Sequence, residues 1–405
     1  MEHAETHTAV RTAPDTSDWP LYTRQRLLAL AVGVATFLVF QLLSLLPGLV
    51  EAVYARSLSP MIVRSLSFVT GLLPFSLVEL VAIFYVVWML VLLVRTGILV
   101  VRKQRRLRNA VLGGSLRMAR DAGVMMVLFY FLWGFNYARR PLDERLEWPE
   151  WSAPDIDELE RLAVTAVEAA NRAYFEIHEA EDAGVPTAMP ADVGALDDAL
   201  EEGWSKAAEF LDLPASTGKR YSRTKRLLLS PLVARLGIAG FYSPFTAEAN
   251  VLRDSPVVSR SQSMAHEKAH QRGIGPESEA SFLGFVAGAL APHPHARYSA
   301  LVFAQGQLLR VLARSDRDAA REVVANRFPG IRRDLEDLSE YWERFQGVGT
   351  TIGRAVNDRY LRTNRVRAGV RSYGLSVRLI ITFAAQHDGR LVPNDGRTER
   401  GKDGR

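Results

Sequence analysis

The chain has 405 residues, of which 48% are hydrophobic and 23% are charged, and its formal net charge is +5. This length is enough for two structural units. The absence of cysteine excludes disulfides and thiolate metal sites, so that His and carboxylate side chains are the candidate metal ligands. Much of the positive excess lies in one short loop between apolar segments, which indicates membrane topology rather than nucleic-acid binding.

The N-terminal third predicts a membrane region. Residues 1–20 are polar and are expected to form a disordered cytoplasmic tail. A three-helix transmembrane region is expected over residues 21–140, with spans at about 27–50, 72–94 and 122–138. Only Glu79 interrupts the second span, and the third is followed by an aromatic and basic boundary at Trp133, Tyr137, Arg139 and Arg140.

Basic residues predict how these spans are oriented. Only Arg56 and Arg64 lie between the first two spans, whereas eight basic residues lie between the second and third: Arg95, Arg102, Lys103, Arg105, Arg106, Arg108, Arg117 and Arg120. The positive-inside rule therefore places the N-terminus and the second loop in the cytoplasm. With three crossings, everything after Arg140 is expected to be extracytoplasmic.

The remainder of the chain predicts a mainly helical domain. Residues 141–152 are expected to be a linker, residues 153–386 the extracytoplasmic domain and residues 387–405 a disordered tail. Helices are expected over about 156–183, 196–211 and 225–236. The stretch Phe241–Leu252 combines aromatic and β-prone residues with Pro244, which favours a short edge strand or hairpin.

That predicted strand has two interpretations. It is either a plain structural strand or the edge on which an extended peptide substrate is held by backbone pairing. In the second interpretation the substrate strand consists of Phe241, Tyr242, Ser243, Phe245 and Thr246.

The segment that follows contains His266-Glu-Lys-Ala-His270, an H-E-x-x-H pattern. Positions i and i+4 share one face of a helix, so both imidazoles can reach one metal ion. Zn²⁺ accepts His nitrogens, and a catalytic site needs three protein ligands and a water. Glu267 is placed to act as the general base on that water.

The third metal ligand is expected on a second helix that begins after Pro276. Glu277 shares a helix face with the small residues Ala280, Ser281 and Gly284, whereas Glu279 points away from that face, so Glu277 is preferred and Glu279 is the alternative. A histidine of the turn at His293 and His295 is a further possibility. Candidate donors to a transition state are His293, His295, Tyr298 and Tyr360.

These residues suggest a family. Three apolar segments are followed by five motifs: Trp133-Gly-Phe-Asn-Tyr137, Gly240-Phe-Tyr-Ser-Pro-Phe-Thr-Ala-Glu-Ala-Asn250, His266-Glu-x-x-His-Gln-x-Gly273, Glu277-x-Glu-Ala280 and Ser372-Tyr-Gly374. This order resembles an uncharacterised bacterial membrane family, domain of unknown function 3810. The resemblance implies a multi-pass protein of the bacterial inner membrane.

The pattern is also similar, more distantly, to that of the gluzincin metallopeptidases. That resemblance implies a zincin-like domain with His266, His270 and Glu277 as zinc ligands and Glu267 as base. Two features depart from it: Ser281 replaces the usual Asp or Asn, and the gap from His270 to Glu277 is short.

The sequence as a whole predicts a membrane-anchored zinc metallopeptidase. Its expected partners are the lipid bilayer and a peptide or envelope-amide substrate, with no nucleic acid. One alternative is a non-catalytic zincin-like scaffold in envelope assembly, and another is zinc-dependent hydrolysis of a different envelope bond. A transport role is disfavoured because Glu79 is the only charged residue in the predicted spans.

Overall fold

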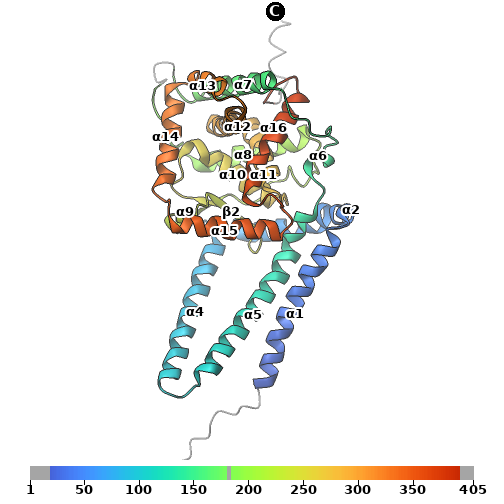
Figure 1. The fold of residues 1–405 in the computed structure, drawn as a ribbon, viewed down its shortest axis with the longest axis vertical. Helices are drawn as coiled ribbons and strands as arrows, with labels where there is room; N and C mark the ends of the chain where they lie inside the picture. The colour runs from blue at the N-terminus through green and yellow to red at the C-terminus, as the bar shows by residue number, and fades with distance from the viewer. Residues whose placement is uncertain (1–18, 180–183, 393–405) are drawn as a thin grey trace, which may run out of the picture. The chain divides into compact units, whose positions relative to one another are not determined.

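The computed structural model describes residues 19–179 and 184–392 and is mainly helical (Figure 1). The predicted tails therefore lie largely outside the described residues. Their described parts are structured, since helix α1 begins at Trp19 and Leu391 is buried in the core. The chain divides into two compact units, one of Met1–Gln41 and Val86–Tyr130 and the other of Leu42–Tyr85 and Phe131–Arg405.

The first unit is built from most of α1 (Trp19–Leu43), the second half of α4 (Leu77–Val101) and most of α5 (Leu107–Leu132). α1 and α5 approach so closely that a Cβ on Gly33 would lie 2.6 Å from the Cα of Gly123. An Arg26 hydrogen bond to the Gly113 carbonyl (3.4 Å) and the stacking of Phe40 on Tyr130 (4.7 Å) lie on either side of this contact. Because the three contacts follow the same order along both helices, α1 and α5 run parallel.

Two of the described helices are long and apolar enough to cross a membrane, Tyr22–Leu43 and Leu77–Val101. The prediction of three such helices was wrong in its third member. α5 ends at Leu132 and a 3₁₀ helix, η3 (Gly134–Ala138), follows, so the predicted span 122–138 is not one helix. The preceding part of α5 carries Arg117, Arg120 and Asp121, too many charges for an 18-residue apolar window.

The other two predicted spans also have different ends in the structure. The first stops at Leu43 rather than residue 50, because Pro47 begins a new helix. The second begins at Leu77 rather than residue 72, where the Ser76 hydroxyl accepts the Glu79 amide.

The segment between α1 and α4 is folded into the second unit. It forms α2 (Pro47–Leu49), the π-helical η2 (Val50–Leu58) and α3 (Ser59–Gly71). Ser67 Oγ accepts from the amide of Ser222 (2.7 Å), and Thr70 donates to the carbonyl of Thr246 (3.0 Å). Glu79, in the first turn of α4, accepts the amides of Leu228 (2.8 Å) and Leu229 (2.6 Å). These polar contacts explain why Glu79 is tolerated in an apolar helix.

The core of the second unit is a stack of helices around α11 (Glu277–Leu290), whose residues are buried from Ala280 to Ala289. Around it pack α7 (Ile156–Phe175), α8 (Val193–Phe210), α12 (Pro294–Ser315) and α16 (Ser376–Ala385). α7 follows Asp155, whose side chain caps the helix by accepting the Glu158 amide at 2.7 Å. The predicted linker 141–152 contains α6 (Leu142–Arg145), and Leu142 is buried in this core.

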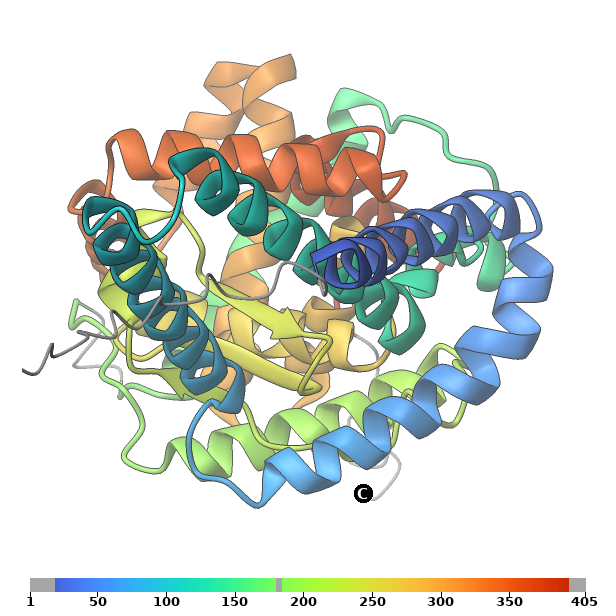
Figure 2. The ribbon, with the colours of Figure 1, turned by 90° about the horizontal axis from the view of Figure 1, so that it is seen from below.

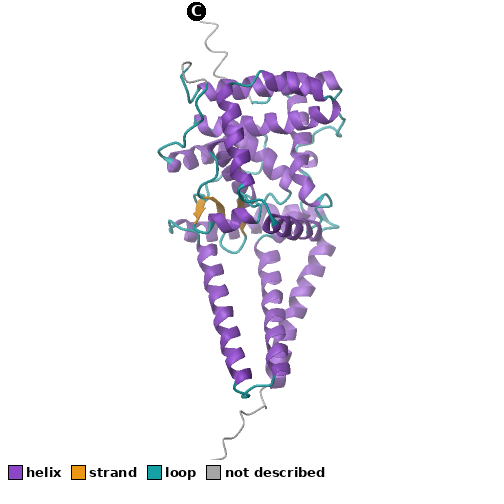
Figure 3. Ribbon diagram, turned by 60° about the vertical axis from the view of Figure 1, so that its left-hand side comes forward, coloured by secondary structure: helices purple, strands orange, loops and turns teal. Residues whose placement is uncertain are grey.

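A three-stranded sheet lies at one end of the helical stack (Figure 3). Its order is β1 (Lys225–Leu227), β3 (Glu248–Leu252) and β2 (Gly240–Ser243), with β1 parallel and β2 antiparallel to β3. The predicted helix 225–236 was wrong in its first part, which is β1, and α9 (Ser230–Arg235) follows it. The predicted hairpin is present, and β2 is an edge strand of the sheet.

The other helices complete the second unit: α10 (Val257–Gln271), α13 (Arg317–Ala325), α14 (Pro329–Glu343), α15 (Val348–Thr363) and the 3₁₀ helix η5 (Gly369–Leu375). α10 packs between α11 and the sheet. In this unit α9, β2 and α15 lie at one end, and α7 and α13 lie at the other (Figure 1).

Candidate metal centre

The H-E-x-x-H segment and Glu277 meet across a tight turn. His266 and His270 lie on α10, and Glu277 is the first residue of α11. Gly273, with φ of +73°, reverses the chain between them, and a Cβ there would meet Asn136 Oδ1 at 3.0 Å. The carbonyl of Gly273 accepts a hydrogen bond from Arg139 (2.8 Å), which fixes the turn from a distant segment.

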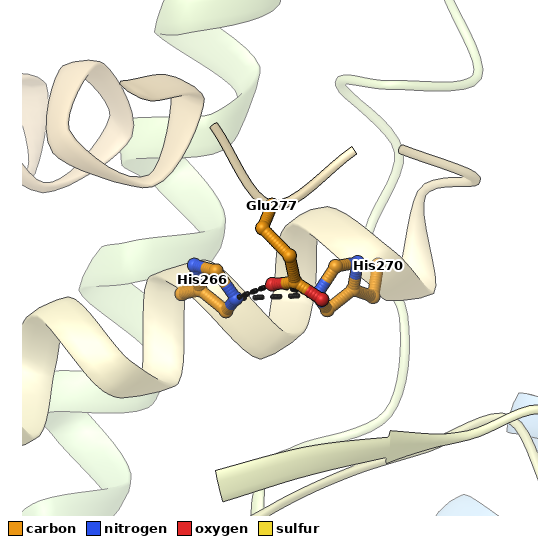
Figure 4. A group of neighbouring side chains, drawn as sticks. All are labelled: His266, His270 and Glu277. Atoms are coloured by element: carbon orange, nitrogen blue, oxygen red, sulfur yellow. Dashed lines mark hydrogen bonds and ion pairs between the residues drawn. The ribbon is translucent and has the colours of Figure 1, made fainter. Parts of the chain in front are cut away.

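The three side chains converge on one point. Glu277 Oε2 lies 3.0 Å from His266 Nε2 and 3.4 Å from His270 Nε2, and the two Nε2 atoms are 3.1 Å apart (Figure 4). One ligand atom from each residue lies within 4.8 Å of the others. Within the described ranges, this is the one group of three or more His, Cys, Asp or Glu residues that could hold a metal ion.

The other nitrogen of each imidazole is held by a neighbour. His270 Nδ1 lies 2.7 Å from the carbonyl of Ile274, which can only accept, so Nδ1 carries a proton and Nε2 of the neutral ring has its lone pair free. His266 Nδ1 lies 3.1 Å from Ser281 Oγ. Such hydrogen bonds orient metal-binding imidazoles and fix their tautomer.

Glu267 lies on the same helix and faces the edge strand. Gly240 lies so close that a Cβ there would approach Glu267 Oε1 to 2.9 Å, and the amide of Tyr242 hydrogen-bonds to the carboxylate. Burial raises the pKa of Glu267 to about 7, although the two imidazoles oppose this shift. A carboxylate with this pKa is suited to accept and return a proton near neutral pH.

The charges of the centre are not balanced by any cationic side chain that contacts it in the described chain. Burial lowers the pKa of His270, but Glu277 more than reverses this effect and raises it to about 9. Burial likewise raises the pKa of Glu277, and His270 and His266 reverse it to well below the usual range. These shifts indicate that the buried carboxylates favour added positive charge beside them, either as protons on the imidazoles or as a divalent cation.

The centre lies in a cleft of about 1080 Å³. Its polar lining includes His266, Glu267, His270, Glu277, Ser281, Gln262, Asn357, Tyr360, Tyr373, Arg310 and Arg354. Its apolar walls include Leu236, Ile238, Phe241, Val258, Val302, Phe303, Leu335, Leu338, Ile352, Val356 and Val370. The volume and the mixed lining suit several residues of a peptide or a molecule of similar size.

Part of the predicted substrate strand borders this cleft. Phe241 and Tyr242 line it, together with Gly240. The Ala239 carbonyl accepts from the Leu252 amide (3.1 Å), and by strand alternation the backbone groups of Gly240 and Tyr242 point away from β3.

Of the other predicted substrate-strand residues, Ser243 ends β2, and Phe245 and Thr246 belong to the turn that follows it. Ser243 and Thr246 are buried and bonded to each other, Thr246 Oγ1 to Ser243 Oγ at 2.8 Å, and Phe245 lies between them. The structure therefore brings two of the five residues to the cleft.

The structure places the alternative ligand Glu279 elsewhere. Its carboxylate pairs with Arg145 (2.6 Å) and accepts the Leu142 amide (3.0 Å), so it holds α6 against α11. This contact follows from the helix geometry, because residues two apart project to nearly opposite sides.

Three of the four predicted transition-state donors are also remote from the cleft. His293 caps α12 and accepts the His295 amide, His295 Nε2 bonds to the Ala188 carbonyl (3.0 Å), and Tyr298 donates to Asp334 (2.6 Å). Only Tyr360 lines the cleft, with its hydroxyl 3.2 Å from that of Tyr137.

Tyr373 is a cleft residue to which the sequence assigned no role. Its ring stacks on His266 with centroids 6.0 Å apart, and its hydroxyl contacts Glu277. Burial, then the charge of Glu277, raises the pKa of Tyr373, so the phenol remains a hydrogen-bond donor at neutral pH. The only signal in the sequence is the Ser372-Tyr-Gly374 motif, which marks the residue without giving its neighbour.

Comparison with known proteins gives one match. A family model described as a protein of unknown function (DUF3810) matches residues 54–381, a range that includes the whole candidate centre. No curated protein matches the chain, and no solved structure matches it.

Proposed function

Because the chain belongs to the DUF3810 family, whose description assigns no activity, we propose its function from the site: a membrane-anchored zinc metallopeptidase that hydrolyses peptide or related amide bonds on the extracytoplasmic face. The observation that carries the proposal is the convergence of His266, His270 and Glu277 beside Glu267 in one cleft.

The donor set fits zinc. Two imidazole nitrogens and one carboxylate oxygen form a three-ligand set of the kind found in catalytic zinc sites. The negative charge of the centre and the fixed Nδ1 of His270 favour a cation at the two Nε2 atoms. A zinc ion bound there would supply Lewis acidity toward a carbonyl oxygen and toward a bound water.

The chain's own residues supply the remaining chemistry. Glu267 accepts a proton from the attacking water on its carboxylate and delivers it to the leaving amine. Tyr373 donates its phenolic proton in a hydrogen bond to the oxygen on which charge develops. The outward backbone groups of Gly240 and the outward carbonyl of Tyr242 pair with an extended substrate.

The order of the segments supports membrane anchoring. The residues between α1 and α4 contact residues of the 131–405 part within the second unit, as the Ser67–Ser222 and Thr70–Thr246 hydrogen bonds show. If α1 and α4 each cross the bilayer, α5 must return the chain to the same side. α5 has 26 residues, about 39 Å at 1.5 Å per residue, which exceeds the hydrocarbon thickness of about 30 Å.

The orientation rests on the connection between α4 and α5. It carries Arg102, Lys103, Arg105 and Arg106, which the positive-inside rule assigns to the cytoplasm. In this proposal the second unit is extracytoplasmic.

The test uses the full chain purified in detergent. Its zinc content and its cleavage of a defined peptide mixture, followed by mass spectrometry, are compared with those of Glu267→Gln and of Glu202→Gln, a matched change on an exposed residue of α8. We expect all three proteins to hold zinc. Only Glu267→Gln should lose turnover, by about 10²–10⁴-fold, as expected for removal of a general base.

Two results would contradict the proposal. Equal turnover of Glu267→Gln and the wild type would remove Glu267 from the reaction. Zinc binding without cleavage of any peptide in the mixture would favour the non-catalytic scaffold.

A further inference from the structure

Helix α15 has an exposed apolar face. Its exposed residues recur every four positions, at Val348, Ile352, Val356 and Tyr360, with exposed fractions of 76%, 54%, 63% and 37%. Four-residue spacing places them on one side of the helix. An exposed row of this kind on a protein surface marks an interaction site.

The row continues onto α9. Gly349 and Gly353 let α15 lie directly on the end of α9, where added Cβ atoms would lie 2.7 Å from the Arg235 carbonyl oxygen and 2.1 Å from that of Leu236. Around this contact Leu228, Leu232 and Leu236 are exposed by 51%, 55% and 37%. The two helices therefore present one apolar surface.

A third segment adds to it. On α3, Met61, Phe68 and the adjoining Leu72 are exposed by 68%, 73% and 72%. Seen from below, α3 (light blue) and α15 (orange-red) lie on the face of the second unit that is turned to the viewer (Figure 2). We call the exposed apolar residues of α3, α9 and α15 the basal surface.

The basal surface adjoins the start of one candidate membrane span, α4. α3 is the last helix of the segment that connects α1 to α4, the two helices of spanning length. α9 is tied to the first turn of α4, because Glu79 accepts the amides of Leu228 and Leu229. The basal surface thus lies at the level where α4 begins.

The charge pattern around α15 also favours lipid. Residues 348–371 contain six arginines and only one acid, Asp358: Arg354, Arg359, Arg362, Arg365, Arg367 and Arg371. A helix with one apolar side and a basic polar side is typical of segments that lie in the interface of a bilayer with anionic lipids.

We propose that the basal surface is embedded in the headgroup boundary of the bilayer that α1 and α4 cross, with lipid as its occupant. Ile352, Val356 and Tyr360 line the metal-centre cleft as well as this surface, so the cleft opens at the membrane. It follows, resting on the proposed function, that the substrate is a peptide or amide attached to the membrane.

The test exploits the lack of cysteine in the chain. Single cysteines at Val356 and Met61 are labelled with an environment-sensitive fluorophore, and the full chain is reconstituted in vesicles of phosphatidylcholine and phosphatidylglycerol. The matched control is Ile156→Cys, an apolar residue that is 48% exposed and begins α7 at the opposite end of the unit (Figure 1). Quenching by lipids with a nitroxide near the headgroup is compared with quenching by iodide in the water.

We expect a blue-shifted emission and strong nitroxide-lipid quenching at positions 356 and 61. Position 156 should respond to iodide alone. Iodide quenching of position 356 as strong as at position 156 would overturn the proposal. So would a blue shift without lipid quenching, which would mean that a protein or a second copy covers the surface. Because no step needs hydrolysis, this result is independent of whether the proposed activity is found.

Discussion

The two sides of helix α10 both bury charged side chains, but only one side pairs each charge with an opposite charge of the protein. On one side Lys268 pairs with Asp197 (2.9 Å) and Glu201 (2.6 Å), and Arg272 pairs with Glu201 (2.7 Å) while covering the Trp204 ring. Two cations and two anions cancel there. On the other side His266, Glu267 and His270 face Glu277, and no Lys or Arg contact compensates the two carboxylates within the described chain.

The difference assigns distinct roles to neighbouring residues. The balanced side, with all its charges paired inside the protein, acts as a structural anchor between α10 and α8. On the unbalanced side the charge of the carboxylates is neutralised only by bound protons or by an added cation. Neighbours in the sequence, such as Glu267 and Lys268, can therefore have different roles, and the side chains that face each of them decide which role it has.

The largest expected effect is on the balanced side. Lys268→Met would leave Asp197 and Glu201 buried with only Arg272 as a cation, and we expect a loss of about 3–5 kcal/mol in the free energy of unfolding. Denaturant unfolding of the purified chain measures it. The matched control is Lys206→Met, which removes an exposed pair with Glu202 and should cost less than about 1 kcal/mol. Similar losses for the two variants would mean that the buried network is not an anchor.

A smaller loss in the free energy of unfolding is expected at acidic pH. Burial alone would raise the pKa of Glu201, but Arg272 and Lys268 lower it to about 2. Because the folded-state pKa is below the ordinary value of 4.5, the contribution of this carboxylate is complete above about pH 4.5 and is lost as the pH falls toward 2. The shift corresponds to about 3 kcal/mol at most.

Unfolding measured between pH 5 and pH 3 tests this expectation. Glu201→Gln should be less stable than the wild type at pH 7 but should lose less further stability on acidification. Parallel pH profiles of the two proteins would show that other carboxylates account for the acid sensitivity.

The smallest effect is expected on the unbalanced side. Ser281→Ala removes the partner of His266 Nδ1, and we expect zinc affinity to fall about 10- to 100-fold through loss of imidazole orientation. Unfolding of the zinc-free protein should hardly change. Competitive zinc titration measures the affinity, with Ser339→Ala on exposed α14 as the control. If Ser281→Ala instead unfolds the protein and leaves the affinity intact, the hydroxyl has a packing role.

The sequence predicted the local geometry of the centre well. His266 and His270 are one helical turn apart, and the small-residue face of α11 correctly selected Glu277 over Glu279 as the carboxylate nearest the imidazoles. Gly284 of that face packs so closely on α10 that an added Cβ would lie 3.0 Å from the main-chain nitrogen of His266. These relations depend on helix periodicity alone, so they can be derived from residue spacing.

Relations across long separations could not be derived in this way. Lys268 and Glu201 are 67 residues apart, and five helices lie between His266 and Tyr373 in the chain. The extent of α5 was mispredicted because only its second half is apolar enough to indicate a span, whereas its first half carries charged residues such as Arg117 and Arg120. In the segment between α1 and α4, Ser67 and Thr70 gave no sign of partners located more than 150 residues later.

The discontinuity of the second unit has a consequence for biogenesis. The start of α4 is capped by Glu248, which accepts the Leu77 amide at 3.0 Å across 171 residues. At about 5–20 residues per second, a ribosome needs roughly 10 to 35 s to supply that partner. Until then the amide groups at the start of α4 are without this partner, and a fragment that begins at residue 141 would lack one wall of its own fold.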